Sequence, residues 1–143
     1  MSAAMSTEGE TMPVFHFHVP RGFDVARKHR IADAANQSLV DALGIPEGDR
    51  FVTITEHGPG ELHIHPTFMG MQRSEGAVIV DILMGAHRPL EQKKQLFATL
   101  AALLEQQAGI RPDDLFIAAI PVPNENFSFG RGLAQLAEGA PKW

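Results

Sequence analysis

The chain has 143 residues, of which 44% are hydrophobic and 20% are charged, and its formal net charge is -5. This length and balance indicate one compact domain with a single core, and the negative charge argues against a general nucleic-acid binder. The absence of cysteine excludes disulfides, thiolate metal sites and cysteine nucleophiles. No apolar run approaches the roughly 18 residues of a membrane span, so we expect a cytoplasmic protein without a membrane or nucleic-acid partner.

Residues 1–12 are rich in Ser, Thr, Gly and Glu, and they contain neither a basic side chain nor an apolar stretch. This composition differs from that of a signal peptide. We expect residues 1–12 to form a flexible polar lead and residues 13–143 to form the single domain.

The first half of that domain has the pattern of a strand, a helix and a second strand. Residues 14–19 alternate in polarity, with Phe15, Phe17 and Val19 on one face and Val14, His16 and His18 on the other. A helix is predicted from the N-cap Asp24 to about Leu43, because apolar residues recur there at helical spacing and Gly44 can end the helix. A second strand is predicted over residues 50–56.

The second half repeats this order. Residues 77–84 form a nearly continuous apolar run, as expected of a buried central strand. A helix is predicted to start near Pro89, a residue suited to the first helical position, and to end at Gly109. A fourth strand is predicted over residues 115–120, and residues 122–143 form a tail.

A shift of 65 positions lays the first half on the second. Strand Val14–Val19 then falls on Ile79–Met84, Gly44 on Gly109, and Asp49 on Asp114. The repeats are residues 13–57 and 77–121. A connection that contains a helix favours parallel pairing with a right-handed crossover. We therefore predict an α/β fold of two β-α-β repeats, with a four-stranded, mostly parallel sheet and two helices on one face.

The other face of such a sheet is uncovered in a single chain. It would carry Val14, Ile79 and Leu83. Because a soluble protein seldom leaves such a surface bare, we expect a homo-oligomer.

Pro13 offers unusual chemistry only if it is the first residue of the working chain. If Met12 were the true start and were removed, Pro13 would have a free secondary amine, a base and nucleophile whose pKa burial and nearby cations can lower toward neutrality. If the chain begins at Met1, the Pro13 nitrogen is an ordinary amide without a proton to exchange.

Arg88 and Asp49 are the other candidate site residues. Arg88 precedes the predicted helix start at Pro89, where free N–H groups favour anions, and a guanidinium there can bind a carboxylate through two hydrogen bonds. Considered alone, a solvated arginine at a helix start is the simpler explanation. Asp49 can act as a base, orient water or cap a turn, and the matching Asp114 favours the cap. The residues form a candidate site only as a set, because neighbouring first and third strands would bring Pro13 near Arg88.

An ordered set of short segments covers nearly everything from residue 12 to residue 135. The segments are Met12-Pro13-Val14, Gly44-Ile45-Pro46-Glu47-Gly48-Asp49-Arg50-Phe51, Thr55-Glu56-His57-Gly58-Pro59-Gly60-Glu61, Gly70-Met71-Gln72-Arg73-Ser74, Arg88-Pro89-Leu90-Glu91-Gln92-Lys93-Lys94, Gly109-Ile110-Arg111-Pro112-Asp113-Asp114 and Asn126-Phe127-Ser128-Phe129-Gly130-Arg131-Gly132. This set resembles the tautomerase superfamily, and most closely its malonate semialdehyde decarboxylase-like branch.

The resemblance implies a role for each candidate. Pro13 would match the catalytic amino-terminal proline, Asp49 the acidic residue of the branch, and Arg88 one of two arginines that hold the substrate carboxylate. His87 and Phe127 would lie beside the substrate with Arg88. The resemblance also implies a homotrimer, a small carboxylate substrate and no cofactor.

Three departures from the family pattern accompany the resemblance. Ala86 stands where the second arginine would fall, and a neutral His87 is a poor replacement for it. Phe127 stands where family members usually have tryptophan. Twelve residues precede Pro13. The first departure weakens malonate semialdehyde as the substrate more than it weakens tautomerase-like chemistry.

The resulting hypothesis is an enzyme that tautomerises, hydrates or decarboxylates a small 2-oxo, enol or 3-oxo acid. An alternative is a non-catalytic oligomeric binding module with the same fold and an acylated Pro13.

Metal binding is a further alternative, because two pairs of histidines have the spacing of ligands on one strand face: His16 with His18, and His63 with His65. Additional ligands could come from His29, His57 or Asp81. Histidines on a sheet face at a subunit interface are the simpler explanation.

Overall fold

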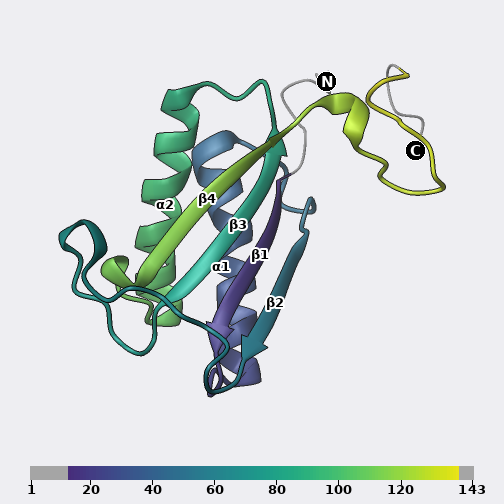
Figure 1. The fold of residues 1–143 in the computed structure, drawn as a ribbon. Coiled ribbons are helices and arrows are strands. Elements are labelled where there is room, and N and C mark those ends of the chain that lie inside the picture. The colour runs from purple at the N-terminus through teal and green to yellow at the C-terminus, as the bar shows by residue number, and fades with distance from the viewer. Residues whose placement is uncertain (1–12, 139–143) are drawn as a thin grey trace.

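The structure is a computed structural model that describes residues 13–138, so the predicted lead over residues 1–12 and the end of the tail lie outside the described residues. The helices and strands follow the predicted order (Figure 1): β1 (Val14–Pro20), α1 (Val25–Leu43), β2 (Val52–His57), β3 (Val78–Gly85), α2 (Leu90–Ala108) and β4 (Leu115–Val122). Short 3₁₀ turns occupy Phe68–Gly70, Pro112–Asp114 and Asn124–Asn126.

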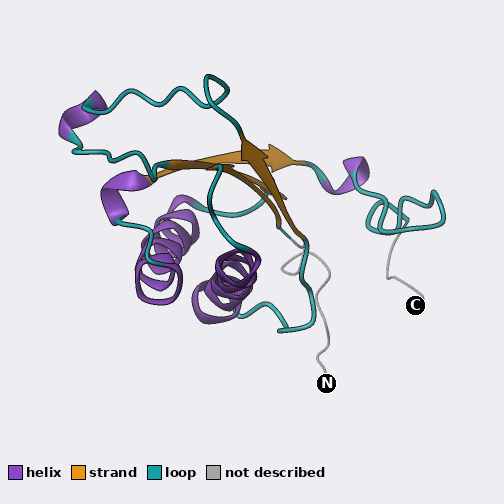
Figure 2. Ribbon diagram, turned by 90° about the horizontal axis from the view of Figure 1, so that it is seen from below, coloured by secondary structure: helices purple, strands orange, loops and turns teal. Residues whose placement is uncertain are grey.

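The four strands form one sheet in the order β2-β1-β3-β4. β1 is parallel to β2 and β3 is parallel to β4, whereas β1 and β3 are antiparallel. Each helix connects the two strands of one parallel pair, and both helices cover the same face of the sheet (Figure 2). The predicted fold of two β-α-β repeats is therefore confirmed. Neither helix in the described part of the chain combines the length and apolar character that a membrane crossing needs.

The two repeats correspond closely in their helices. α1 spans residues 25–43 and α2 spans residues 90–108, so both ends differ by the shift of 65 found in the sequence. Both helices end at a glycine in the left-handed conformation, Gly44 with φ 68° and Gly109 with φ 67°. The N-cap of α1 is Asp24, whose carboxylate accepts a hydrogen bond from the Arg27 backbone N–H at 2.8 Å.

The strand boundaries differ from the predicted ones by one or two residues, and two differences involve prolines. Pro89 is the N-cap of α2 and not its first helical residue, so the helix begins at Leu90. β4 continues through Pro121, which pairs with Met84. A proline is tolerated there because β4 is an edge strand, where the missing N–H removes no bond to a second neighbour.

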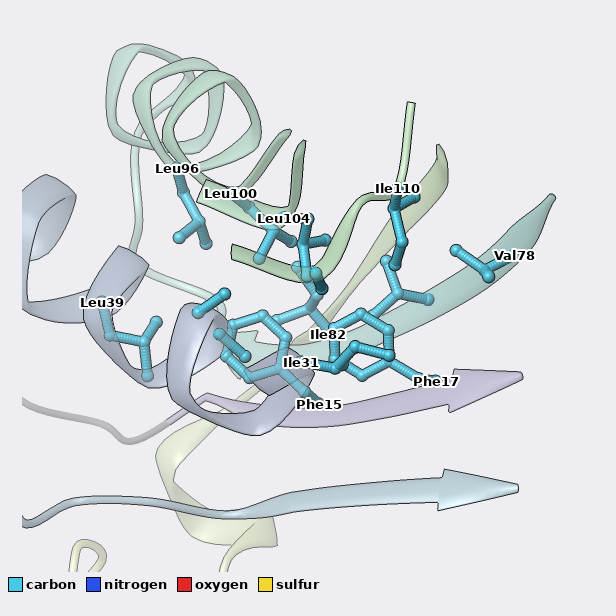
Figure 3. Packing of buried hydrophobic residues seen from close by; sticks show 14 of the residues in the cluster. Phe15, Phe17, Ile31, Leu39, Val78, Ile82, Leu96, Leu100, Leu104 and Ile110 are labelled. Carbon is cyan, nitrogen blue, oxygen red and sulfur yellow. The ribbon is translucent and has the colours of Figure 1, made fainter. Parts of the chain in front are cut away.

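The core lies between the sheet and the two helices (Figure 3). Its fully buried large side chains come from both strands and helices and include Phe15, Phe17, Ile31, Leu39, Ile82, Leu96, Leu100 and Leu104. Because side chains alternate along a strand, the odd-numbered residues of β1 face the helices and the even-numbered ones face the open side of the sheet.

The open side of the sheet is partly apolar. Leu83, Phe116 and Ile120 project from β3 and β4 and are 36%, 41% and 44% exposed. Val14, Ile79 and Leu83 all lie on this side, as predicted, with Val14 and Ile79 only partly exposed. The polar outward residues lie mainly on β1 and β2.

The helix C-cap supplies a test of this architecture. Replacing Gly44 by alanine should lower the free energy of unfolding by about 1–2 kcal/mol, because an L side chain is strained at its φ of 68° although no atom lies within 4 Å of the added Cβ. Gly48 is the matched control: its Cβ position is equally open and its φ is not positive. Urea unfolding at one fixed chain concentration should show no loss for Gly48→Ala, and equal losses in the two variants would contradict the assignment.

Candidate active site

The antiparallel pairing of β1 and β3 positions the first site residue. Val14 pairs with Leu83, so the start of β1 lies beside the end of β3. Pro13 immediately precedes this pair and is buried. The chain turns directly after β3, and the Arg88 backbone N–H donates to the Gly85 carbonyl at 3.3 Å. Pro13 and the Arg88 turn therefore lie at the same end of the sheet, as expected from sequence.

The turn before β2 reaches the same end. The Phe15 backbone N–H donates to the Phe51 carbonyl at 3.0 Å, and Phe15 pairs with Val52. Asp49 precedes Phe51 by two residues, so it lies beside the beginning of β1. In Figure 1 the start of β1, the start of β2 and the end of β3 all lie at the top of the sheet. The structure thus brings the segments that contain all three candidates to the same end of the sheet.

Arg88 is almost completely buried, at 7% exposure. Its burial lowers the pKa of the guanidinium from the ordinary value, although arginine remains a cation at neutral pH. The guanidinium Nη1 donates to Gln92 Oε1 at 3.1 Å. Since Arg88 lies two residues before the first residue of α2, its charge adds to the positive end of the helix dipole, and the combination favours an anion.

Gln92 was not identified from the sequence. Its side chain orients Arg88 from one helical turn further along, four residues away. The signal that could have found it is this spacing, because residues four apart share one face of a helix.

Asp49 and Asp114 correspond in the repeat but differ in their surroundings. Asp114 is buried and accepts hydrogen bonds from the Ser74 backbone N–H at 2.7 Å and the Ser74 hydroxyl at 2.6 Å, so it fastens the long connection before β3. The Asp49 carboxyl is partly buried, and burial raises its pKa above the ordinary value of 3.8. Among the described residues no hydrogen bond to the Asp49 side chain compensates for this burial. The structural role inferred from the repeat therefore belongs to Asp114.

The two remaining predicted site residues have different positions. His87 is exposed next to Arg88 in the turn after β3. Phe127 is half-buried against Phe129, with ring centroids 5.7 Å apart. The segment that contains Phe127 extends away from the sheet and helices in both views (Figures 1 and 2). Ala86 is exposed in the turn.

The histidine pairs are separated by the fold. His16 and His18 project from β1 on the open side of the sheet, where Asp81 joins them. His63 and His65 lie in the connection before β3, where their rings bond to the backbone of that connection at Gly60 and Thr67.

Known proteins resemble this chain over most of its length. A family model described as tautomerase enzyme matches residues 49–130. The probable tautomerase YrdN of Bacillus subtilis (strain 168) is 30% identical over 128 residues, which cover 90% of this chain and 98% of that protein. The crystal structure of malonate semialdehyde decarboxylase, described as a basis for decarboxylase and hydratase activities, has a TM-score of 0.81 and 34% identity, covering 87% of this chain and 96% of that one. A fused 4-OT, a symmetric trimer, shares the fold with a TM-score of 0.73 at 18% identity, covering 88% and 98% of the two chains.

The pKa of Asp49 yields a test by stability. A folded-state pKa above the unfolded value means that the ionised carboxylate destabilises the fold at neutral pH, and this cost disappears as the pH falls toward 3.8. Asp49→Asn should therefore unfold at a higher urea concentration than the parent at pH 7, with a difference that shrinks steadily toward pH 4.

The matched control is Asp41→Asn, which removes an exposed carboxylate bonded to Gln37. It should give no comparable gain at pH 7. A gain for both variants would point to net charge, and no gain for Asp49→Asn would show that the carboxylate is solvated.

Proposed function

We propose a reaction for this chain, which belongs to the tautomerase family and is an enzyme of that family: it moves a proton within a small 2-oxo or enol carboxylic acid. The Pro13 amine would act as the acid and base, and Arg88 would anchor the substrate carboxylate. The observation that carries this proposal is the placement of a buried proline beside the turn of a buried arginine at one end of the sheet.

Arg88 would bind the carboxylate with a charge-assisted hydrogen bond, strengthened by the start of α2 and by burial. Gln92 would keep the guanidinium oriented. Burial and a nearby cation both disfavour a charged ammonium, so a free Pro13 amine would have a lowered pKa and could exchange protons near neutral pH.

Asp49 would supply the second proton-transfer group. Because burial raises its pKa, a larger fraction of the Asp49 carboxyl is neutral at a given pH than would be neutral in water. A carboxyl that is kept partly buried without a compensating hydrogen bond destabilises the fold, and such groups are found where catalysis requires them. In this proposal Asp49 receives or returns the proton that Pro13 moves, or orients a water for hydration.

The choice between tautomerisation and hydration or decarboxylation depends on the charge of the Pro13 amine and on the number of cations in the site. A neutral amine suits tautomerisation, whereas a protonated one would polarise a carbonyl for hydration or decarboxylation. The decarboxylase neighbour has activities of the second kind. The second substrate-binding arginine of the family pattern would fall at Ala86, whose methyl group cannot polarise a carbonyl, and His87 beside it is exposed. We therefore favour tautomerisation of an enol acid.

This mechanism requires the working enzyme to begin at Pro13. If Pro13 instead keeps its amide bond to Met12, the same fold would serve as a binding module for small carboxylates. The intact mass of the natural protein distinguishes the two forms.

Pro13→Ala and Arg88→Ala should each abolish most turnover of an enol acid at substrate concentrations below KM. A positioned general acid-base is worth about 100- to 10,000-fold in rate, so kcat should fall by that order in Pro13→Ala, and kcat/KM should fall mainly through KM in Arg88→Ala. Conversion is measured by ultraviolet absorbance on protein whose mass shows that the chain begins at position 13. Circular dichroism should show both variants folded, and retained turnover in Pro13→Ala would refute the mechanism.

We further propose that the protein is a homo-oligomer, and specifically a trimer. The support is the partly apolar open side of the sheet, the outward-extending segment after β4, and the family resemblance. An assembly of this kind would cover the sheet and give the extended segment a surface to pack on.

Light scattering should give three times the chain mass for the parent protein. Leu83→Glu places a charge on the open side and should shift the protein toward smaller species. Val25→Glu is the matched control, since Val25 is 67% exposed at the first residue of α1 and away from the sheet. A monomeric parent protein would refute the proposal.

A further inference from the structure

We propose that His16, His18 and Asp81 form a binding site for a divalent transition-metal ion on the open side of the sheet. One ligand atom from each of these residues lies within 4.8 Å of the others. They form the one such trio of histidine and carboxylate side chains among residues 13–138. Only a modest closing of side chains is needed, since ligands about 2.0–2.2 Å from a zinc ion lie closer together than this.

The sheet itself brings the three residues together. His16 and His18 are two apart on β1, so they project to the same side. Asp81 is the antiparallel partner of His16 on β3. The rings of the two histidines are 4.1 Å apart, and Nε2 of His18 lies 3.5 Å from Oδ2 of Asp81. Backbone pairing in the middle of the sheet therefore fixes the ligand spacing.

The neighbouring strand β2 holds both rings from the other side. His18 Nδ1 lies 2.9 Å from His57 Nε2, and His16 Nε2 lies 2.8 Å from the Thr55 hydroxyl. Metal-binding imidazoles almost always bond through their second nitrogen to a partner that sets the tautomer and the ring orientation. In this site His18 would bind the metal through Nε2 and His16 through Nδ1, with His57 and Thr55 as the supporting partners.

The ligand set indicates the class of ion. Two imidazoles and one carboxylate suit zinc, cobalt, nickel or copper, whereas calcium and magnesium prefer oxygen ligands. Three protein ligands leave a coordination position for water or for a group from another molecule.

The site is distinct from the proposed active site. His16 and His18 project from β1 on the side away from the helices, whereas Pro13 is buried just before the strand begins. Loss of metal binding and loss of enol-acid turnover can thus be measured separately, and neither depends on the other.

The test uses the full chain without an affinity tag, freed of metal by a chelator and then dialysed to equilibrium against Zn²⁺. Elemental analysis should find one zinc per chain. His18→Ala should weaken binding by on the order of 100-fold or more, because even a supporting partner of a metal ligand is worth about 10- to 100-fold. Thr55→Val should weaken binding by about 10-fold, and Asp81→Asn should do so without changing the size of the side chain. Co²⁺ in place of Zn²⁺ should give visible absorbance that disappears in His18→Ala.

The matched control is the double variant His63→Ala/His65→Ala, which removes two imidazoles bonded to their own connection. It should bind zinc like the parent protein. Circular dichroism establishes that each variant is folded. Absence of stoichiometric zinc in the parent protein, or equal loss in the control and in Asp81→Asn, would overturn the proposal and leave these histidines as polar side chains of the sheet surface.

Discussion

The antiparallel pairing of β1 with β3 is the contact on which the remaining structure depends. Each repeat supplies one parallel strand pair and one helix, and residues of both repeats form one core. The pairing joins the repeats through the two central strands, so that Phe15 and Phe17 pack with Ile82 beneath both helices. The same pairing turns the two repeats in opposite directions along the sheet. For that reason the beginning of the first repeat meets the turn that leaves the third strand.

Both proposed sites depend on this single arrangement, because a strand has two sides. Toward the helices and at the end of the sheet, the pairing brings Pro13 to the turn of Arg88. Toward the open side, it places Asp81 opposite His16. The first location is buried and suits proton transfer to an anchored anion. The second is partly exposed and offers nitrogen and oxygen donors.

Much of the fold could be predicted from the sequence, because the signals were local and were repeated. Asp24 and Gly44 bound the first helix, and the shift of 65 transferred these limits to the second. The proximity of Pro13 and Arg88 followed from the strand order. The burial of polar side chains in the turns could not be predicted, because it depends on packing between distant segments. The sequence alone therefore favoured a solvated Arg88 and a turn-capping Asp49, whereas the structure buries Arg88 and gives the structural contacts to Asp114. Gln92 was missed because its one signal, the four-residue spacing from Arg88, does not by itself distinguish it.

The strict alternation of side chains along β1 has a consequence for how the gene can vary. Inserting or deleting one residue within β1 would send the two phenylalanines to the solvent side and the two histidines into the core. The long connection between β2 and β3 has no such alternation to preserve, and most of its side chains are exposed. Among natural homologues we expect length differences to occur in that connection, whereas the first strand should show no insertion or deletion of a single residue.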